Sequence, residues 1–143
     1  MLARELQAHE ARIFDRMTPP REIGSWYVTR ILHDARGSGG DLLVAEHNGR
    51  VLGYATLLVG QSSEPAMDEV LYTFAYVGDL VVAPAVRGQG IGKALLAECE
   101  RLARAAGEKW LRITVLSRNL RAVSLYRQLG FDSQFTNMEK QLS

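Results

Sequence analysis

The spacing of apolar side chains divides the chain into predicted helices and strands. Apolar residues recur at helical intervals over residues 2–16 and again over 21–35, and the Thr18-Pro19-Pro20 break separates the two stretches. Strands are expected where apolar residues alternate or run together, at 41–46, 51–59, 71–82 and 110–116. Two further helices are expected at 90–106 and 119–130, and a closing strand or hairpin at 131–141.

Turn residues support this division. Asn48-Gly49 is a strong two-residue hairpin pattern between the first two strands, and the glycines of residues 37–40 predict a flexible turn before them. Residues 61–69 form a polar loop. The order is helix, helix, three strands, helix, strand, helix, strand, which predicts a mixed α/β fold with a βαβ unit near the middle of the chain.

Composition narrows the class of protein. A chain of 143 residues fits one domain, 1–143, with 47% hydrophobic and 23% charged residues, as in an average globular protein. The net charge of +1 gives no support for binding to nucleic acid or a membrane. No apolar run reaches the length of a membrane span, and the first residues contain no apolar signal core, so a cytoplasmic protein is expected.

The single cysteine and the three histidines point to no metal or nucleophile. Cys99 follows the helical stripe of Leu95, Leu96 and Leu102, which favours core packing over covalent catalysis. The histidines are scattered along the chain, without cysteine or carboxylate at metal-binding spacing, so no metal is expected. They are His9, His33 and His47.

The most informative stretch is 81–96, where an apolar run stops at Pro84 and a glycine-rich turn leads into an amphipathic helix. Such a turn directs backbone N–H groups and the positive end of the helix dipole toward one point, which suits a phosphate. A Walker A loop would need glycine where Arg87 stands and Ser or Thr where Ala94 stands. The dinucleotide pattern G-x-G-x-x-G also fails, which disfavours an adenine-nucleotide binder.

Two motifs carry a family resemblance. Arg87, Gly90 and Gly92 form R-x-x-G-x-G, which resembles the acetyl-CoA pyrophosphate loop of the GNAT superfamily of N-acetyltransferases. The segment 119–131 resembles the later N-x-x-A-x-x-L-Y-x-x-x-G-F segment of that family, and the resemblance runs from about residue 41 to 142. It implies a mixed, mostly antiparallel central sheet flanked by helices, with strands splayed apart at the acetyl-CoA site. Members usually open with a strand, so that strand is missing here or the chain starts inside the domain.

The same resemblance implies the cofactor-binding residues. Arg87 and the backbone N–H groups that follow it would bind the pyrophosphate, and the end of the third strand would pair with the pantetheine arm. Asn119 resembles the residue that bonds the amide region of the arm, although it is equally a plain helix cap. Tyr126 resembles the general acid, with a core tyrosine as the alternative. The backbone positions are Leu80, Val81, Val82, Gly88, Gln89, Gly90, Ile91, Gly92 and Lys93.

The general base is predicted from one unusual residue. Asp79 is the acidic residue inside the third strand, a position where aspartate is depleted. It could take the proton of the incoming ammonium directly or through water, contact a cationic substrate, or serve as a structural hydrogen-bond acceptor. Glu64, Asp68 and Glu69 could rim the acceptor mouth, although a solvated loop explains them as well.

These observations predict an acetyl-CoA-dependent N-acetyltransferase that acts on a primary amine by direct transfer in a ternary complex. The alternative is a non-catalytic acyl-CoA-binding sensor or interaction module of the same fold. A small polyamine or aminoglycoside, an amino acid, and a protein N-terminus or lysine all stay open as acceptors. A homodimer is a further expectation, with Trp26, Tyr27 and the last strand as candidate contacts.

Overall fold

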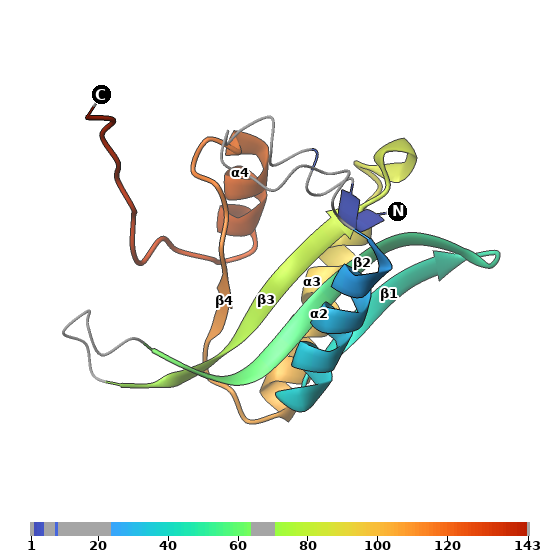
Figure 1. The fold of residues 1–143 in the computed structure, drawn as a ribbon, viewed down its shortest axis with the longest axis horizontal. Coiled ribbons are helices and arrows are strands. Elements are labelled where there is room, and N and C mark those ends of the chain that lie inside the picture. Colours follow the sequence, from blue (N-terminus) through green and yellow to red (C-terminus); the bar gives the residue numbers. More distant parts are fainter. Residues whose placement is uncertain (1, 5–7, 9–23, 64–70, 143) are drawn as a thin grey trace.

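The computed structural model describes residues 2–4, 8, 24–63 and 71–142. Residues 2–4 and 8 are helical, within the first predicted helix, whose other residues lie outside the described ranges. The remaining elements follow in chain order (Figure 1). They are α2 (Ser25–Gly37), β1 (Asp41–His47), β2 (Arg50–Ser62), β3 (Thr73–Val82), a 3₁₀ turn (Pro84–Val86), α3 (Ile91–Ala105), β4 (Leu111–Ile113) and α4 (Leu120–Gln128).

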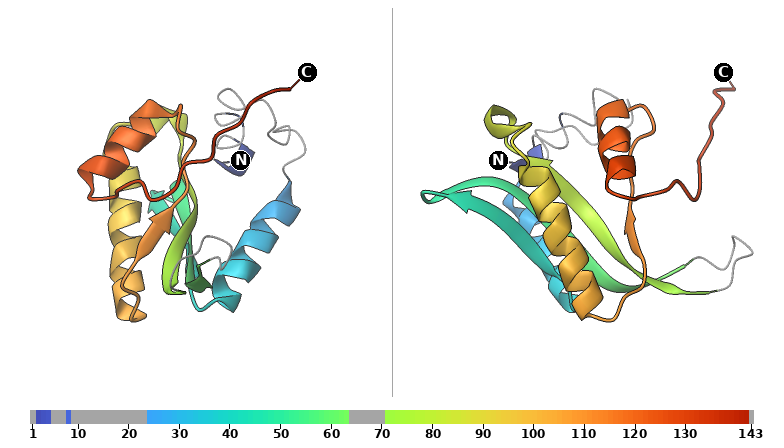
Figure 2. Two further views of the ribbon diagram at one scale, coloured as in Figure 1. Left: turned by 90° about the vertical axis from the view of Figure 1, so that its left-hand side faces the viewer. Right: turned by 180° about the vertical axis from the view of Figure 1, so that it is seen from behind.

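The strands form one sheet in the order β1-β2-β3-β4, antiparallel except for the parallel pair β3 and β4. Figure 2 shows α3 and α4 on one face of the sheet and α2 on the other. The main core lies between the sheet and α3. It contains Ala55, Leu57, Ala75, Val77, Leu95, Leu96, Cys99 and Ala103. The predicted mixed, mostly antiparallel sheet flanked by helices is therefore confirmed.

The predicted hairpin between β1 and β2 is present. Asn48 and Gly49 have φ values of 50° and 75°. A two-residue turn with both residues in this left-handed region matches the right-handed twist of the two strands, which is why Asn-Gly is favoured there.

A β-bulge interrupts the pairing of β2 with β3. Ala55 faces Leu80 and Leu57 faces Val77, so β3 has one more residue than β2 between these pairs. The backbone N–H of Asp79 donates instead to the Oγ1 atom of Thr56, over 2.7 Å. A bulge of this kind bends its strand and re-aims the side chains beyond it.

Past the bulge, β3 separates from β4. Their parallel pairing covers only Ala75–Val77 against Leu111–Ile113, whereas β3 continues to Val82. Figure 1 shows the two strands diverging. Because β3 bends away, the residues that follow Ile113 lose their neighbour, and β4 is shorter than the predicted strand at 110–116. The splayed strands that the family resemblance implied are present.

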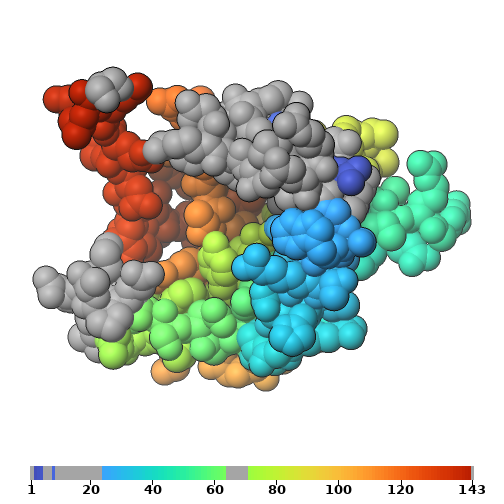
Figure 3. All heavy atoms as spheres, viewed as in Figure 1, coloured from blue at the N-terminus to red at the C-terminus, as the bar shows by residue number. Residues whose placement is uncertain are grey.

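The predicted closing strand at 131–141 is wrong. Residues 131–142 contain no strand, and the segment stands apart from the sheet (Figures 1 and 3). Three of its large apolar side chains, Phe135, Met138 and Leu142, are exposed. They lie three and four positions apart, so an extended chain would not bring them to one face that the sheet could bury.

Two other expectations concern the missing first strand and membrane-spanning segments. No strand precedes β1 within the ranges given above, so the sheet as described begins with the β1–β2 hairpin. None of the helices in these ranges is long and apolar enough to cross a bilayer.

The bulge leads to a stability prediction. A Cβ atom on Gly78 would lie 2.8 Å from Thr56 Oγ1, too close for a real contact. We expect Gly78→Ala to lower the free energy of unfolding by about 1–3 kcal/mol, the usual cost of overpacking. Urea unfolding measures the change. Gly37→Ala is the matched control, because its Cβ would meet nothing within 4 Å and would favour the helix. Equal stability of Gly78→Ala and the parent would contradict the close approach.

Candidate active site

The glycine turn lies between the end of β3 and the start of α3. Gly88 and Gly90 have φ values of 79° and 85°, in the left-handed region that residues with a side chain rarely adopt. Gly90 is the N-cap residue of α3. A Cβ atom on Gly90 would meet nothing within 4 Å, so the space beside the turn is open. The first N–H groups of a helix have no acceptor within the helix, so those of α3 are available to an anion here.

Two arginines lie at this turn. The Nε atom of Arg87 donates to the carbonyl of Val82 over 3.0 Å, which fastens the turn to the end of β3. The Nη2 atom of Arg121, on α4, lies 4.0 Å from the position of a Cβ on Gly88. Sequence reasoning missed Arg121, because only the folded chain brings the start of α4 to the glycine turn. The turn therefore offers cations from two elements beside its backbone N–H groups.

The splay leaves one side of β3 without a strand partner. Beyond Val77, no strand among those described pairs with β3 on the side of β4. The residues concerned include Leu80, Val81 and Val82, which lead directly into the glycine turn. An extended ligand could therefore pair with this backbone as an added strand would.

Asn119 and Tyr126 belong to the α4 region. The Oδ1 atom of Asn119 accepts a hydrogen bond from the N–H of Ala122 over 3.3 Å, so the residue is the helix cap that the alternative prediction described. Tyr126 is half-buried, packs against the main core, and its ring centre lies 5.9 Å from that of Phe131. These contacts give both residues structural roles, and their roles in binding and catalysis stay predictions.

The side chain of Asp79 lies in a cluster of tyrosines. The hydroxyl group of Tyr27, on α2, lies 2.9 Å from Oδ2 and 3.1 Å from Oδ1, and that of Tyr54, on β2, donates to Oδ2 over 3.0 Å. Burial raises the pKa of Asp79, and the two hydroxyl groups partly oppose this by stabilising the carboxylate. Sequence reasoning missed both tyrosines as partners, since they come from elements distant in the chain.

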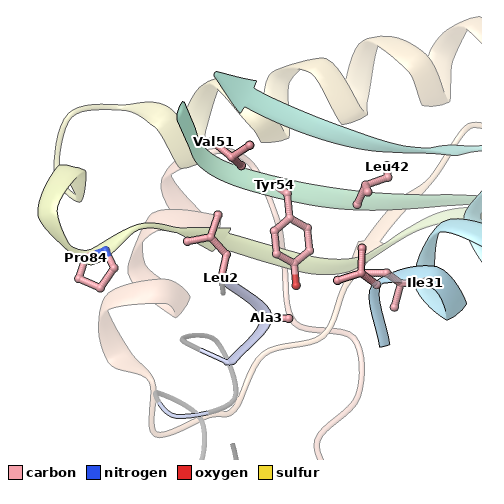
Figure 4. A pocket seen from close by; sticks show the side chains of 8 residues that line it. Leu2, Ala3, Ile31, Leu42, Val51, Tyr54 and Pro84 are labelled. Atoms are coloured by element: carbon pink, nitrogen blue, oxygen red, sulfur yellow. The ribbon is translucent and has the colours of Figure 1, made fainter. Parts of the chain in front are cut away.

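A pocket adjoins this cluster on the α2 side of the sheet. Its volume is about 550 Å³, and Tyr54 stands in its wall with the hydroxyl group pointing toward Ala3 and Ile31 (Figure 4). The other residues that line it are apolar: Leu2, Val28, Leu42, Val51 and Pro84.

Of the remaining candidates, Cys99 lies away from the site and several others lie outside the described ranges. Cys99 is fully buried in the main core, and burial raises the pKa of its thiol to about 11, which fits the predicted packing role. No group of three metal-ligating side chains occurs among the described residues. The acidic residues Glu64, Asp68 and Glu69 lie outside those ranges, as does His9.

The raised pKa of Asp79 makes stability depend on pH. A carboxyl group that binds its proton more tightly when folded stabilises the fold at low pH, and this contribution is lost as the pH rises through the folded-state pKa. We therefore expect the parent to lose stability relative to Asp79→Asn as the pH rises above the usual carboxyl range near 4. Urea unfolding of both proteins over a pH series measures this difference. A difference that stays constant, or that changes in favour of the parent, would contradict the desolvated carboxylate.

The chain resembles known acetyltransferases in sequence and in structure. It is 32% identical over 124 residues to the L-methionine sulfoximine/L-methionine sulfone acetyltransferase of Salmonella typhimurium, a match that covers 86% of this chain and 66% of that protein. The chain spans only part of the length of its curated relatives. The match covers 66% of the Salmonella typhimurium protein, 32% of a thialysine N-epsilon-acetyltransferase of Bos taurus and 19% of a mycothiol acetyltransferase of Nocardia farcinica.

Solved structures share the fold. A mutant form of a Bacillus halodurans protein superposes with a TM-score of 0.84 at 19% identity, covering 99% of this chain and 90% of that one. AAC(6′)-Iy, in complex with the bisubstrate analogue CoA-S-monomethyl-acetylneamine, superposes with a TM-score of 0.60 at 18% identity, covering 71% of this chain and 68% of that one.

The sequence comparison thus points to the same family as the two motifs, the splayed strands and the glycine turn. The profile of the Acetyltransferase (GNAT) family matches residues 4–131, and the chain belongs to that family.

Proposed function

We propose that this protein is an acetyl-CoA-dependent N-acetyltransferase that transfers the acetyl group directly to a primary amine in a ternary complex. The observation that carries the proposal is the end of β3, whose β4 side has no strand partner among the described residues and which runs straight into the glycine turn before α3. A cosubstrate with an extended amide-containing arm and a pyrophosphate group matches both features.

The residues present fit acetyl-CoA. In this proposal the N–H groups of residues 88–93, with Arg87 and Arg121, bind the pyrophosphate, because an anion gains from both the helix dipole and the two guanidinium groups. The backbone of residues 80–82 pairs with the arm. Asn119 caps α4 and in the proposal also bonds the amide region of the arm.

Two side chains carry the proton transfers. Bound acetyl-CoA supplies the acetyl thioester that the amine attacks. Asp79, directly or through water, takes the proton from the incoming ammonium and leaves the nitrogen a free lone pair. As the new C–N bond forms and the C–S bond breaks, the phenol of Tyr126 gives its proton to the departing sulfur. The nitrogen loses its second proton as the amide forms, and that proton returns through water to the phenolate of Tyr126. A phenol with a usual pKa of about 10 is a competent donor to a thiolate at neutral pH.

One observation favours the alternative, a non-catalytic acyl-CoA-binding module. Tyr126 packs against the core and Phe131, which explains its presence without catalysis. A measurement of free thiol released from acetyl-CoA with a panel of amines separates the two functions. The panel includes polyamines, amino acids and peptides with a free N-terminus or lysine, and no thiol release with any of them would support the binding module.

Dimer formation is a separate part of the proposal. Trp26 on α2 is 53% exposed, which suits a contact between two copies of the chain. The predicted contact through a last strand is not available, since residues 131–142 form no strand.

The phosphate assignment predicts the effect of charge at the glycine turn. Gly90→Asp places a carboxylate beside the proposed pyrophosphate, and like charges repel, so binding of acetyl-CoA in calorimetry should fall by about tenfold or more. Gly90→Asn is the matched control, with the same size and the same backbone strain but no charge, and should bind more tightly than Gly90→Asp. Equal affinities in these two variants would argue against an anion at this turn, as would tighter binding of ATP or NAD than of acetyl-CoA by the parent.

The acid assignment predicts a change in turnover. Tyr126→Phe keeps the ring and its packing on Phe131 but removes the proton donor, so kcat should fall by about 10²-fold, the lower end for general acid catalysis, because water can replace the phenol. The affinity for acetyl-CoA should change little. Steady-state kinetics with an amine found in the panel measures both. An unchanged kcat, where the chemical step limits the rate, would leave Tyr126 with its packing role alone.

A further inference from the structure

The hydrogen bonds of Asp79 involve three residues on two other elements. Tyr27 reaches both carboxylate oxygens from α2, Tyr54 reaches Oδ2 from β2, and Thr56 accepts from the backbone N–H of the same aspartate. A carboxylate held by two hydroxyl groups and a fixed main chain has little freedom to rotate. Its orientation is thus set by α2 and β2 together and not by β3 alone.

The cluster also controls which form of the carboxyl group is present. Burial favours the neutral acid, and hydrogen bonds from the Tyr27 and Tyr54 hydroxyl groups favour the carboxylate. These two phenols and Thr56 are the groups that face Asp79 from the elements packed against it, and no charged side chain of the described residues contributes to its pKa. The two hydroxyl groups therefore favour the carboxylate, the form of this half-buried side chain that can accept a proton.

We propose that Tyr27 and Tyr54 are positioning residues for the Asp79 base, which hold the carboxylate in the orientation and ionised form that deprotonation of the amine requires. The inference rests on the proposed function. In the step concerned, one N–H bond of the ammonium breaks, its proton forms an O–H bond with a carboxylate oxygen, and the electron pair stays on nitrogen. The neutral amine then attacks, and Asp79 later returns the proton to water.

This assignment gives α2 a part in the chemistry. Tyr27 lies in the first turn of α2, and its bonds to Asp79 span 52 positions of the chain. A movement of α2 when an acceptor binds would therefore alter the hydrogen bonds of the base directly. The simpler explanation is that these bonds only tether α2 to the sheet, and the experiment must separate the two.

The test compares Tyr27→Phe, Tyr54→Phe and the double variant with the parent. Each keeps the ring and removes one hydroxyl group. Tyr72→Phe is the matched control, since it also removes a hydrogen-bonded tyrosine hydroxyl group. That group accepts a hydrogen bond from Arg112 of β4, near the opposite end of β3. The first readout is the titration of the Asp79 carboxyl carbon by NMR in the ligand-free chain. The second is kcat/KM against pH with an active amine, and thermal unfolding accompanies both.

We expect the titration midpoint of Asp79 to rise in each Tyr→Phe variant at the site, and to rise further in the double variant. The acidic limb of kcat/KM should move to higher pH in the same order, while the affinity for acetyl-CoA stays within about twofold. Tyr72→Phe should leave the titration midpoint of Asp79 and the acidic limb of kcat/KM unchanged. Asp79→Asn should depress kcat/KM by about 10²–10⁴-fold and abolish this limb.

Three results would overturn the inference. If the Asp79 midpoint does not move in the variants, the hydroxyl groups do not hold the carboxylate. If the midpoint moves but the acidic limb does not, or if only thermal stability falls, the bonds are a tether and the proposed acetyl transfer still stands. If the parent acetylates no amine in the panel, the proposed function fails and the inference fails with it. The assay of the parent alone reveals this outcome, before any variant is compared.

Discussion

The hydrogen bond from the backbone of Asp79 to Thr56 is the contact on which the rest of the site depends. It replaces a ladder hydrogen bond and accommodates one extra residue in β3. Without the bulge, strict alternation would place Asp79 on the same face as Val77, which packs in the core under α3. With it, Asp79 turns toward α2 and the tyrosines, while Leu80 returns to the core side. The same bend separates β3 from β4.

Features encoded by neighbouring residues could be predicted from the sequence. The Asn48-Gly49 turn, the glycine turn before α3, the Asn119 cap and the buried stripe of Cys99 each depend on backbone preferences or helical spacing within a few positions. The family resemblance then supplied the mixed, mostly antiparallel sheet and the splay. These parts of the fold needed no knowledge of contacts between distant segments.

The rest depends on which distant segments meet, and local patterns carry no information on that. Tyr27 and Tyr54 look like ordinary aromatic residues of the core until β3 brings Asp79 within hydrogen-bonding distance of both. Arg121 looks like an exposed helix residue until α4 meets the glycine turn. The closing strand failed for a related reason, because a strand forms only where a neighbour can pair with it, and residues 131–142 stand apart from the sheet.

The position of Asp79 also bears on the choice between an enzyme and a binding module. The end of β3 presents its open edge to the proposed cosubstrate and its α2 face to the space beside Tyr27 and Tyr54, so in the proposed function one strand would serve two different ligands. In the proposed function acetyl-CoA is bound by this edge, the glycine turn, Asn119 and Arg121, and Asp79 takes no part in holding it. A desolvated carboxylate destabilises the fold wherever it is ionised, and an uncharged side chain at this position would avoid that cost. In a module that only bound the cosubstrate, this residue would serve as the hydrogen-bond acceptor that tethers α2 to the sheet, whereas in the proposed enzyme it also accepts the proton of the amine.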